Sequence, residues 1–291
     1  MTGSSASGST SIAMAGGIAS GTRSTAIGND TRATGINAIA LGNRTLASGT
    51  YSFAMGDETI ASGITSVAFG SSAEASGPYS AAIGRRVAAV GEASVVLGAN
   101  AVALQAAKGT FIFADQSTEG TADPLFTGFA PNEFLVRAAG GVGFYTNRAL
   151  TTGLRLAPAG SQWLGVSDVN TKEHFRDVSG EDILRKVAGM PVREWSYKAQ
   201  DPSIRHLGPT AQDFHAAFGL GEDPLRIGSM DADGVALAGV KALERRTRAW
   251  EEERIALLNE LAKLRTENAA LAARVVHIEE ALANLGAGER R

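Results

Sequence analysis

The sequence contains no cysteine, which excludes disulfide bonds, thiolate nucleophiles and cysteine-ligated zinc sites. Its 27 basic and 30 acidic residues leave a formal net charge of -3, so the composition gives no reason to expect nucleic acid or an anionic membrane as a partner. No apolar run reaches the length of a membrane-spanning helix, and residues 1–5 lack the basic and apolar segments of a signal peptide. We therefore expect no membrane insertion and no signal peptide in this chain.

Metal ligands and cofactor-binding patterns are also scarce. Only four histidines are present, and His174, His215 and His277 are expected on helices without the spacing of a metal site. The stretch from Asp231 to Gly234 is similar to the start of a calcium loop, but Val240 stands where that loop needs glutamate. We expect neither a metal nor a cofactor.

Glycine, by contrast, is abundant and periodic. The 35 glycines include two ladders in which each member follows the previous one by fourteen residues. The ladders are Gly28, Gly42, Gly56, Gly70, Gly84 and Gly98, and Gly21, Gly35, Gly49, Gly63, Gly77 and Gly91. Strict repetition at this period predicts a solenoid.

Alanine fills two further columns between the glycine ladders. They are Ala19, Ala33, Ala47, Ala61, Ala75 and Ala89, and Ala26, Ala40, Ala54, Ala68 and Ala82, with Val96 closing the second. Each repeat fits two short strands, with the glycines supplying positive-φ corners. In the second strand the alanine points to one face and its two apolar neighbours to the other. Strands that are apolar on both faces must be covered on both, which a fourteen-residue coil cannot do alone, so neighbouring chains are implied. A flexible Gly/Ala/Ser linker would not keep this register.

Over residues 6–103 these repeats resemble the head repeats of YadA-like trimeric adhesins. That resemblance implies a left-handed parallel β-roll shared by three chains. The first repeat departs from the pattern, because Ala15 replaces a glycine and the step from Gly8 to Gly21 is thirteen. We expect an irregular first coil.

The remainder of the chain divides into three further segments. Residues 105–166 alternate aromatic with small residues and predict a β-rich stalk. Capping signals at Ser179 and Thr210 predict helices that end at Gly189 and Gly219, with a strand over residues 192–197 between them. Residues 240–291 carry apolar residues at alternating steps of three and four, which predicts a coiled coil of six or more heptads. Asn268 at an a position and leucine at most d positions favour a parallel dimer, in conflict with the trimer that the repeats imply.

One pair of residues is a candidate for catalysis. Ser167 and Lys172 would form a nucleophile and its base if a turn brought them together, since a lysine amine can take the proton of a serine hydroxyl once burial favours its neutral form. The simpler alternative is that Ser167 and Asp168 cap a helix.

Four stretches in order closely resemble the peptidase S74 family, the intramolecular chaperone domains of phage tail spikes and fibres. They are Ser167–Glu173, Pro191–Tyr197, Arg205–Phe214 and Asp233–Leu237, followed by the coiled coil. The resemblance implies that the domain drives trimerisation and then releases itself. Ser167 would be the nucleophile, Lys172 the general base and Val166-Ser167 the scissile bond. His206 and Gln212 are supporting candidates, as an orienting residue and an oxyanion donor.

Together these features predict a mainly β protein with a C-terminal α region. It would comprise a trimeric β-roll (1–104), a β-rich stalk (105–166), a small α+β chaperone domain (167–239) and a coiled coil with its tail (240–291). We expect a homotrimeric tail-fibre-like adhesion protein, on a virion or a cell surface, that cleaves itself once in cis and binds a host-surface glycan or protein receptor. The alternative is a fragment of a bacterial trimeric surface adhesin with a non-cleaving chaperone domain. A glycan-degrading fibre is disfavoured, because the repeats place no carboxylate pair in a constant column.

Overall fold

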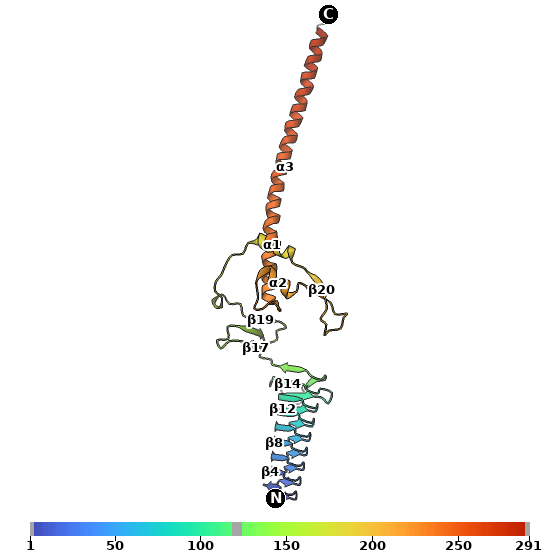
Figure 1. Cartoon of the computed structure of the whole chain (residues 1–291), viewed down its shortest axis with the longest axis vertical. Coiled ribbons are helices and arrows are strands. Elements are labelled where there is room, and N and C mark those ends of the chain that lie inside the picture. Colours follow the sequence, from blue (N-terminus) through green and yellow to red (C-terminus); the bar gives the residue numbers. More distant parts are fainter. Residues whose placement is uncertain (1–2, 118–123, 289–291) are drawn as a thin grey trace. The chain divides into compact units, whose positions relative to one another are not determined.

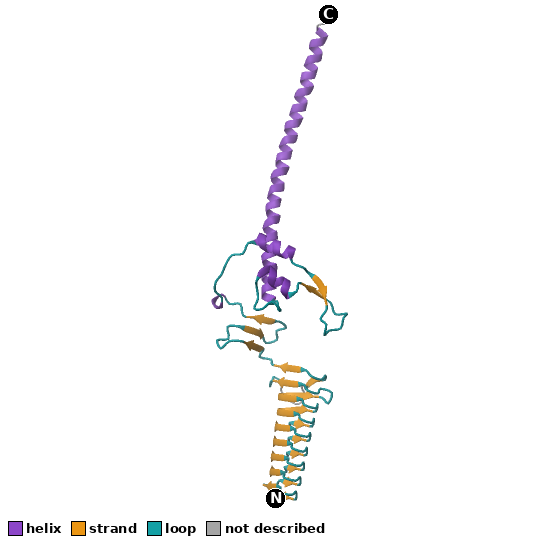
Figure 2. Ribbon diagram, in the orientation of Figure 1, coloured by secondary structure: helices purple, strands orange, loops and turns teal. Residues whose placement is uncertain are grey.

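The computed structural model describes residues 3–117 and 124–288, which belong to two compact units, 1–172 and 173–291. The first unit is built almost wholly of β-strands and the second mainly of helices (Figure 2). The chain is thus mainly β with a C-terminal helix, as the sequence predicts.

The first unit begins with a β-solenoid of about eight turns, whose coils stack one on another (Figure 1). Equivalent strands of successive coils pair in parallel with an offset of one repeat, so that Ala54 lies beside Ala68 and Ala68 beside Ala82. One row of strands is β1 (Ser5–Ala6), β3 (Ile18–Ala19), β5 (Arg32–Ala33), β7 (Leu46–Ala47), β9 (Ile60–Ala61) and β11 (Glu74–Ala75). The other row is β2 (Ile12–Met14), β4 (Thr25–Asn29), β6 (Ile39–Asn43), β8 (Phe53–Asp57) and β10 (Val67–Ser71).

The two rows meet in long strands at the end of the repeats. β12 (Ala81–Ala89) and β13 (Val95–Ala103) run through both rows. β14 (Phe111–Ala114) and β16 (Phe134–Arg137) continue the sheet beyond the last fourteen-residue repeat, and β15 (Phe126–Gly128) pairs with the far end of β13. The solenoid sheet therefore extends further along the chain than the periodicity of the sequence.

The alanine columns form the interior of the coils. Ala26, Ala54 and Ala68 are fully buried, as are the other alanines of both columns. Their neighbours on the same strands point outward and stay partly exposed, for example Phe69 (44%) and Met55 (39%). The prediction of strands that are apolar on both faces is confirmed, and the outer apolar face is partly exposed to solvent.

The prediction that both glycine ladders supply positive-φ corners is wrong for one of them. Gly28, Gly42, Gly56, Gly70, Gly84 and Gly98 have φ between 105° and 140°. The other ladder does not adopt positive φ; a Cβ on Gly63 would lie 2.0 Å from the carbonyl oxygen of Gly77, so close stacking of coils requires glycine there. The remaining left-handed corners are formed by residues such as Asn37 and Tyr51 (φ 56° and 60°). In the expected irregular first coil, Ala15 also has positive φ, and Ile12 pairs with Thr25 at an offset of thirteen.

The first unit ends in a small antiparallel sheet. It comprises β17 (Val142–Tyr145), β18 (Gly153–Leu156) and β19 (Trp163–Gly165). The rings of Phe144 and Trp163 pack with centroids 5.7 Å apart across this sheet.

The second unit contains α1 (Gly180–Gly189), β20 (Arg193–Trp195), β21 (His206–Gly208), α2 (Ala211–Phe218) and α3 (Ser229–Gly288). Both predicted capping signals are confirmed, because Ser179 accepts from Asp182 N and Thr210 from Asp213 N. Ile183, Phe214 and Val235 form the core between the three helices. Residues 231–234 are helical, and no group of three potential metal ligands occurs among the described residues. None of the helices described is long and apolar enough to span a membrane.

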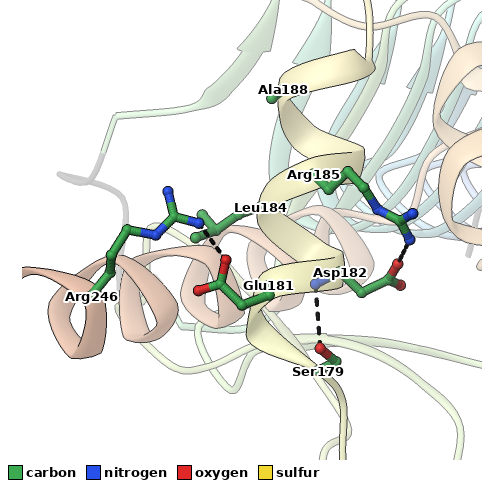
Figure 3. Close-up of a pocket in the computed structure, with 7 residues that line it drawn as sticks. All are labelled: Ser179, Glu181, Asp182, Leu184, Arg185, Ala188 and Arg246. Atoms are coloured by element: carbon green, nitrogen blue, oxygen red, sulfur yellow. Dashed lines mark hydrogen bonds and ion pairs between the residues drawn. The ribbon is translucent and has the colours of Figure 1, made fainter. Parts of the chain in front are cut away.

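Helix α1 packs closely on α3. A Cβ on Gly180 would lie 2.7 Å from the Ala242 Cβ, so the first residue of α1 approaches α3 as only glycine can. Beside this contact, Arg246 of α3 forms an ion pair with Glu181 of α1 (Figure 3). Arg185 and Lys186 both bind the Asp182 carboxylate, and they hold its pKa below the ordinary value.

Candidate active site

The candidate scissile bond follows directly after the small antiparallel sheet. Val166 N donates to Gly153 O at 3.3 Å, which extends the pairing of β19 with β18 by one residue. Val166 is half-buried, whereas Ser167 is exposed. The residue before the candidate cleavage point is therefore held by the sheet, and the nucleophile candidate is the first residue beyond it.

A short turn follows Ser167, because Asp168 caps the 3-10 helix η1 (Val169–Thr171). The Asp168 carboxylate accepts from Asn170 N and from Asn170 Nδ2, both at 2.9 Å. Thr171 Oγ1 donates to Asp168 O at 2.8 Å. A hydrogen bond from an aspartate carboxylate to the backbone two residues ahead is a common local turn. Here the turn ends at Thr171, directly before Lys172.

This turn brings the two candidate catalytic residues together. Lys172 Nζ donates to Ser167 Oγ at 2.6 Å, although five positions separate them. The capping alternative is only partly met, since the cap is the carboxylate of Asp168 and the hydroxyl of Ser167 contacts the lysine instead. A hydroxyl within hydrogen-bond reach of an amine is the arrangement of a serine nucleophile with its base.

The turn also accounts for an expectation that was wrong. We expected His174 on a helix, but it lies between η1 and α1 in a segment without regular secondary structure, with φ 57°. The 3-10 helix ends after three residues because Lys172 returns to an extended conformation. His215 and His277 do lie on helices, α2 and α3.

The supporting candidates belong to the second unit. His206, on β21, stacks on Trp195 of β20 with ring centroids 4.7 Å apart, and its Nε2 lies 2.9 Å from Gln200 Oε1. Tyr197 packs edge-on against both rings. Gln212 lies in the first turn of α2 and lines an open groove with Trp195 and Tyr197. These contacts indicate a structural role for His206. A catalytic role for His206 or Gln212 stays a prediction.

Sequence reasoning missed the residues that shape the site. Asp168, Asn170 and Thr171 form the turn that places Lys172 beside Ser167, and Gln200 is the partner of His206. An Asp-x-Asn stretch is the sequence signal of such a turn.

Comparison with known families agrees with both resemblances. Residues 167–219 match the peptidase S74 model, described as chaperone of endosialidase. Residues 19–45, 33–59 and 61–86 match the YadA head domain repeat. No curated protein sequence matches the chain significantly. The combination supports a self-associating protein of the trimeric-adhesin or tail-fibre type, with an extracellular or surface location.

Proposed function

We propose that the chain is a homotrimeric fibre protein whose region from Ser167 onward guides trimerisation and then cuts itself off in cis. The observation that carries this proposal is the 2.6 Å hydrogen bond between Lys172 Nζ and Ser167 Oγ, directly after a residue held by the sheet. The match of residues 167–219 to a chaperone family supports it independently.

The proposed reaction is a self-cleavage through an ester. Lys172 Nζ takes the hydroxyl proton of Ser167, and Oγ attacks the carbonyl carbon of Val166. The carbon–nitrogen bond between Val166 and Ser167 then breaks, and the proton passes from the lysine to the leaving nitrogen. Water hydrolyses the ester, which leaves a carboxylate on Val166 and a free amine and a restored hydroxyl on Ser167. Each chain reacts once, so no turnover is expected.

Assembly should precede cleavage. A lysine amine accepts a proton only when neutral, and removal from water favours the neutral form. Both side chains of the pair are exposed in the single chain, so the burial that favours proton transfer would come from neighbouring chains. Cleavage then depends on assembly, and losing the guide afterwards makes unfolding hard to reverse.

A fibre of this design has a physical need for a guide. Contacts between chains of a shared solenoid are all non-local, so they form slowly and leave sheet edges exposed to aggregation in the meantime. A helical segment that associates first raises the effective concentration of the three chains.

Expression of the full chain tests the proposal. We expect two fragments, 1–166 and 167–291, with Ser167 as the new N-terminus by mass spectrometry and N-terminal sequencing. Ser167→Ala and Lys172→Ala should each give uncut trimers, because folding needs neither reaction. Lys172→Arg should also stay uncut, since arginine keeps its proton near neutral pH. An intact wild-type trimer, or cleavage of Ser167→Ala at Val166, would contradict the proposal.

The second candidate is a bacterial trimeric surface adhesin with a non-cleaving chaperone domain. Ser167 and Lys172 are both exposed in the single chain, which is the observation that favours this candidate. An intact wild-type trimer would support this candidate. In either case we propose a host-surface glycan or protein receptor as the partner of the solenoid.

A further inference from the structure

The long helix α3 leaves one apolar stripe without a partner. In the heptad register, position a is occupied by Val240, Thr247, Arg254, Leu261, Asn268, Val275 and Leu282, and position d by Leu243, Trp250, Leu257, Leu264, Leu271, Ile278 and Leu285. Val235, Gly239 and Ala242, which lie on another side of the helix, are buried. From Val240 to Leu282 the stripe stays exposed, with Leu257 at 58% and Ile278 at 55%.

Charged residues flank this stripe at the g and e positions. The charged g positions are Arg246, Glu253, Glu260, Glu267 and Arg274. Five residues after Arg246, Glu260 and Arg274 an e position carries the opposite charge, at Glu251, Arg265 and Glu279, whereas uncharged residues follow Glu253 and Glu267 at that distance. In a parallel coiled coil without stagger, a g residue of one helix contacts the e residue five positions later on its neighbour. The aligned arrangement therefore gives three attractive pairs at every helix–helix contact and no repulsive one.

These pairs cannot form inside one helix. Side chains on a single helix meet at steps of three and four, and the ion pairs of α3 with itself follow that rule, as in Arg248–Glu244, Arg254–Glu251 and Lys263–Glu267. Within the described part of the chain, Glu260, Arg265, Arg274 and Glu279 form no salt bridge. These four unpaired charges make up two of the three g–e pairs and are complementary to a second copy of the same helix. The residues of the third pair, Arg246 and Glu251, already have partners within the chain, Glu181 and Arg254.

Staggered arrangements are disfavoured by the same charges. A shift of two heptads sets Arg246 against Arg265 and Glu260 against Glu279 in one direction, and Glu260 against Glu251 in the other. A shift of one heptad mixes attractive with repulsive contacts, such as Glu267 against Glu279. It also moves Asn268 opposite Leu261 or Val275, which leaves a polar side chain unmatched in the seam.

We propose that α3 associates with further copies of itself in parallel and without stagger, and that the g–e pairs determine this register. The number of chains rests on the proposed function, whereas orientation and register rest on α3 alone. A fixed register matters because a slip of one heptad would displace the preceding segments of the chains along the assembly by about 10 Å.

Charge reversal tests the pairs. Arg274 and Glu279 are the best targets, because neither has an acidic or a basic residue other than His277 three or four positions away. In the uncut Ser167→Ala chain, Arg274→Glu and Glu279→Arg should each lower the dissociation midpoint by roughly 5 °C, measured by circular dichroism at fixed concentration. The double variant should recover most of the loss. Glu280→Arg is the matched control, since position f faces away from the seam. Two independent losses without recovery would overturn the proposal.

Cysteine cross-linking tests register and orientation directly, because the native chain has no cysteine. Leu257→Cys and Ile278→Cys, each as a single variant, should both form disulfide-linked chains on mild oxidation. An antiparallel arrangement cannot place both positions opposite their own copies. Linking at only one position, or linking only in mixtures of Leu257→Cys with Leu264→Cys chains, would overturn the proposal.

The outcomes separate this inference from the proposed function. A trimer that cleaves but fails to link at like positions would contradict the register alone. A dimer, or an uncut protein, that links at both positions would keep the register and contradict the proposed function. A monomer would contradict both.

Discussion

Three polar side chains decide whether Ser167 and Lys172 meet. The carboxylate of Asp168 binds both the backbone and the side chain of Asn170, and the hydroxyl of Thr171 closes the turn onto Asp168 O. Without this turn, an extended chain would separate residues five positions apart by about 17 Å between Cα atoms. The contact between Ser167 and Lys172 therefore depends on a neighbour, Asp168, which takes no part in the proposed reaction.

Replacement of that neighbour should slow cleavage without abolishing it. Removing a capping carboxylate costs about 1 kcal/mol, so Asp168→Ala should reduce the cleavage rate about fivefold. The rate is measured by quantifying fragments over time after synthesis. Val169→Ala is the control, because Val169 is 65% exposed and its side chain is not part of these bonds. Equal rates in both variants would show that the cap does not position the pair.

At the scale of a single strand, the solenoid has one buried face and one apolar face that stays partly exposed. On β10, Ala68 is fully buried between stacked coils, while the adjacent Phe69 is 44% exposed. The interior leaves no room for a larger side chain, whereas the outer face presents apolar groups to water. Neighbouring residues on one strand should therefore respond to substitution in different ways.

A matched pair of variants separates the two faces. Ala68→Phe should lower the unfolding free energy of the solenoid by about 1–3 kcal/mol per chain, because overpacking forces the coils apart. Phe69→Ser should leave the strand content unchanged and weaken association between chains. Circular dichroism reports the first effect and light scattering the second. Loss of strand content in Phe69→Ser would contradict the assignment of the outer face.

The end of the solenoid sheet is held by an acidic residue after β14. Asp115 accepts hydrogen bonds from Ser117 Oγ at 2.6 Å, Ala139 N at 2.6 Å and Arg137 Nε at 3.2 Å. Arg137, on β16, also donates to Ala99 O at 2.8 Å. The hydrogen bond from Ser117, followed by those from Ala139 and Arg137, lowers the pKa of Asp115 to about 2.

This carboxylate should make the solenoid acid-sensitive in a defined range. A pKa that is lower in the folded than in the unfolded state adds stability above the ordinary aspartate value near 4, and the contribution is lost as pH falls toward about 2. The melting temperature of Asp115→Asn should therefore lie below that of the native protein at neutral pH, and the difference should shrink between about pH 4 and 2. A difference that stays constant over this range would exclude the carboxylate charge as its cause.

At the scale of the whole molecule, the chain divides into a β-strand unit and a mainly helical unit. The solenoid and the small antiparallel sheet lie in one compact unit with the candidate cleavage site, and the helices lie in the other. Under the proposed function, residues 1–166 of the first unit are the lasting product. Residues 167–172 leave with the second unit, which acts only during assembly.

A chain that ends at residue 166 should therefore fail to assemble when made by itself. The exposed outer face and unpaired sheet edges should drive it into aggregates. The same fragment released from the full chain should stay a soluble trimer, as judged by the soluble fraction and by light scattering after size exclusion. Full-length Ser167→Ala is the control, because it keeps the guide attached. Equal assembly of the short chain would remove the need for a chaperone.

Periodicity made much of this architecture predictable. Fourteen-residue steps of glycine and alanine determined the solenoid, its register and its buried columns. Equivalent residues of successive coils lie beside one another, so each position must meet the same packing requirement in every coil. The caps at Ser179 and Thr210 were readable for a similar reason, since a capping bond spans only three residues. The spacing of Ser167 and Lys172 made them candidates but left open whether they meet.

Only the tertiary structure decided the remainder, where contacts join residues that no local pattern links. It showed that Gly63 is needed for close approach rather than for positive φ, because its constraint lies fourteen residues away in Gly77. It showed that the solenoid sheet continues to Arg137, beyond the last fourteen-residue repeat. It showed that the turn capped by Asp168 brings Lys172 Nζ to Ser167 Oγ, because secondary-structure propensities do not predict the geometry of so short a turn. Finally, it showed which side of α3 is buried and which stripe stays exposed, because that choice depends on how α1 and α2 pack against the helix.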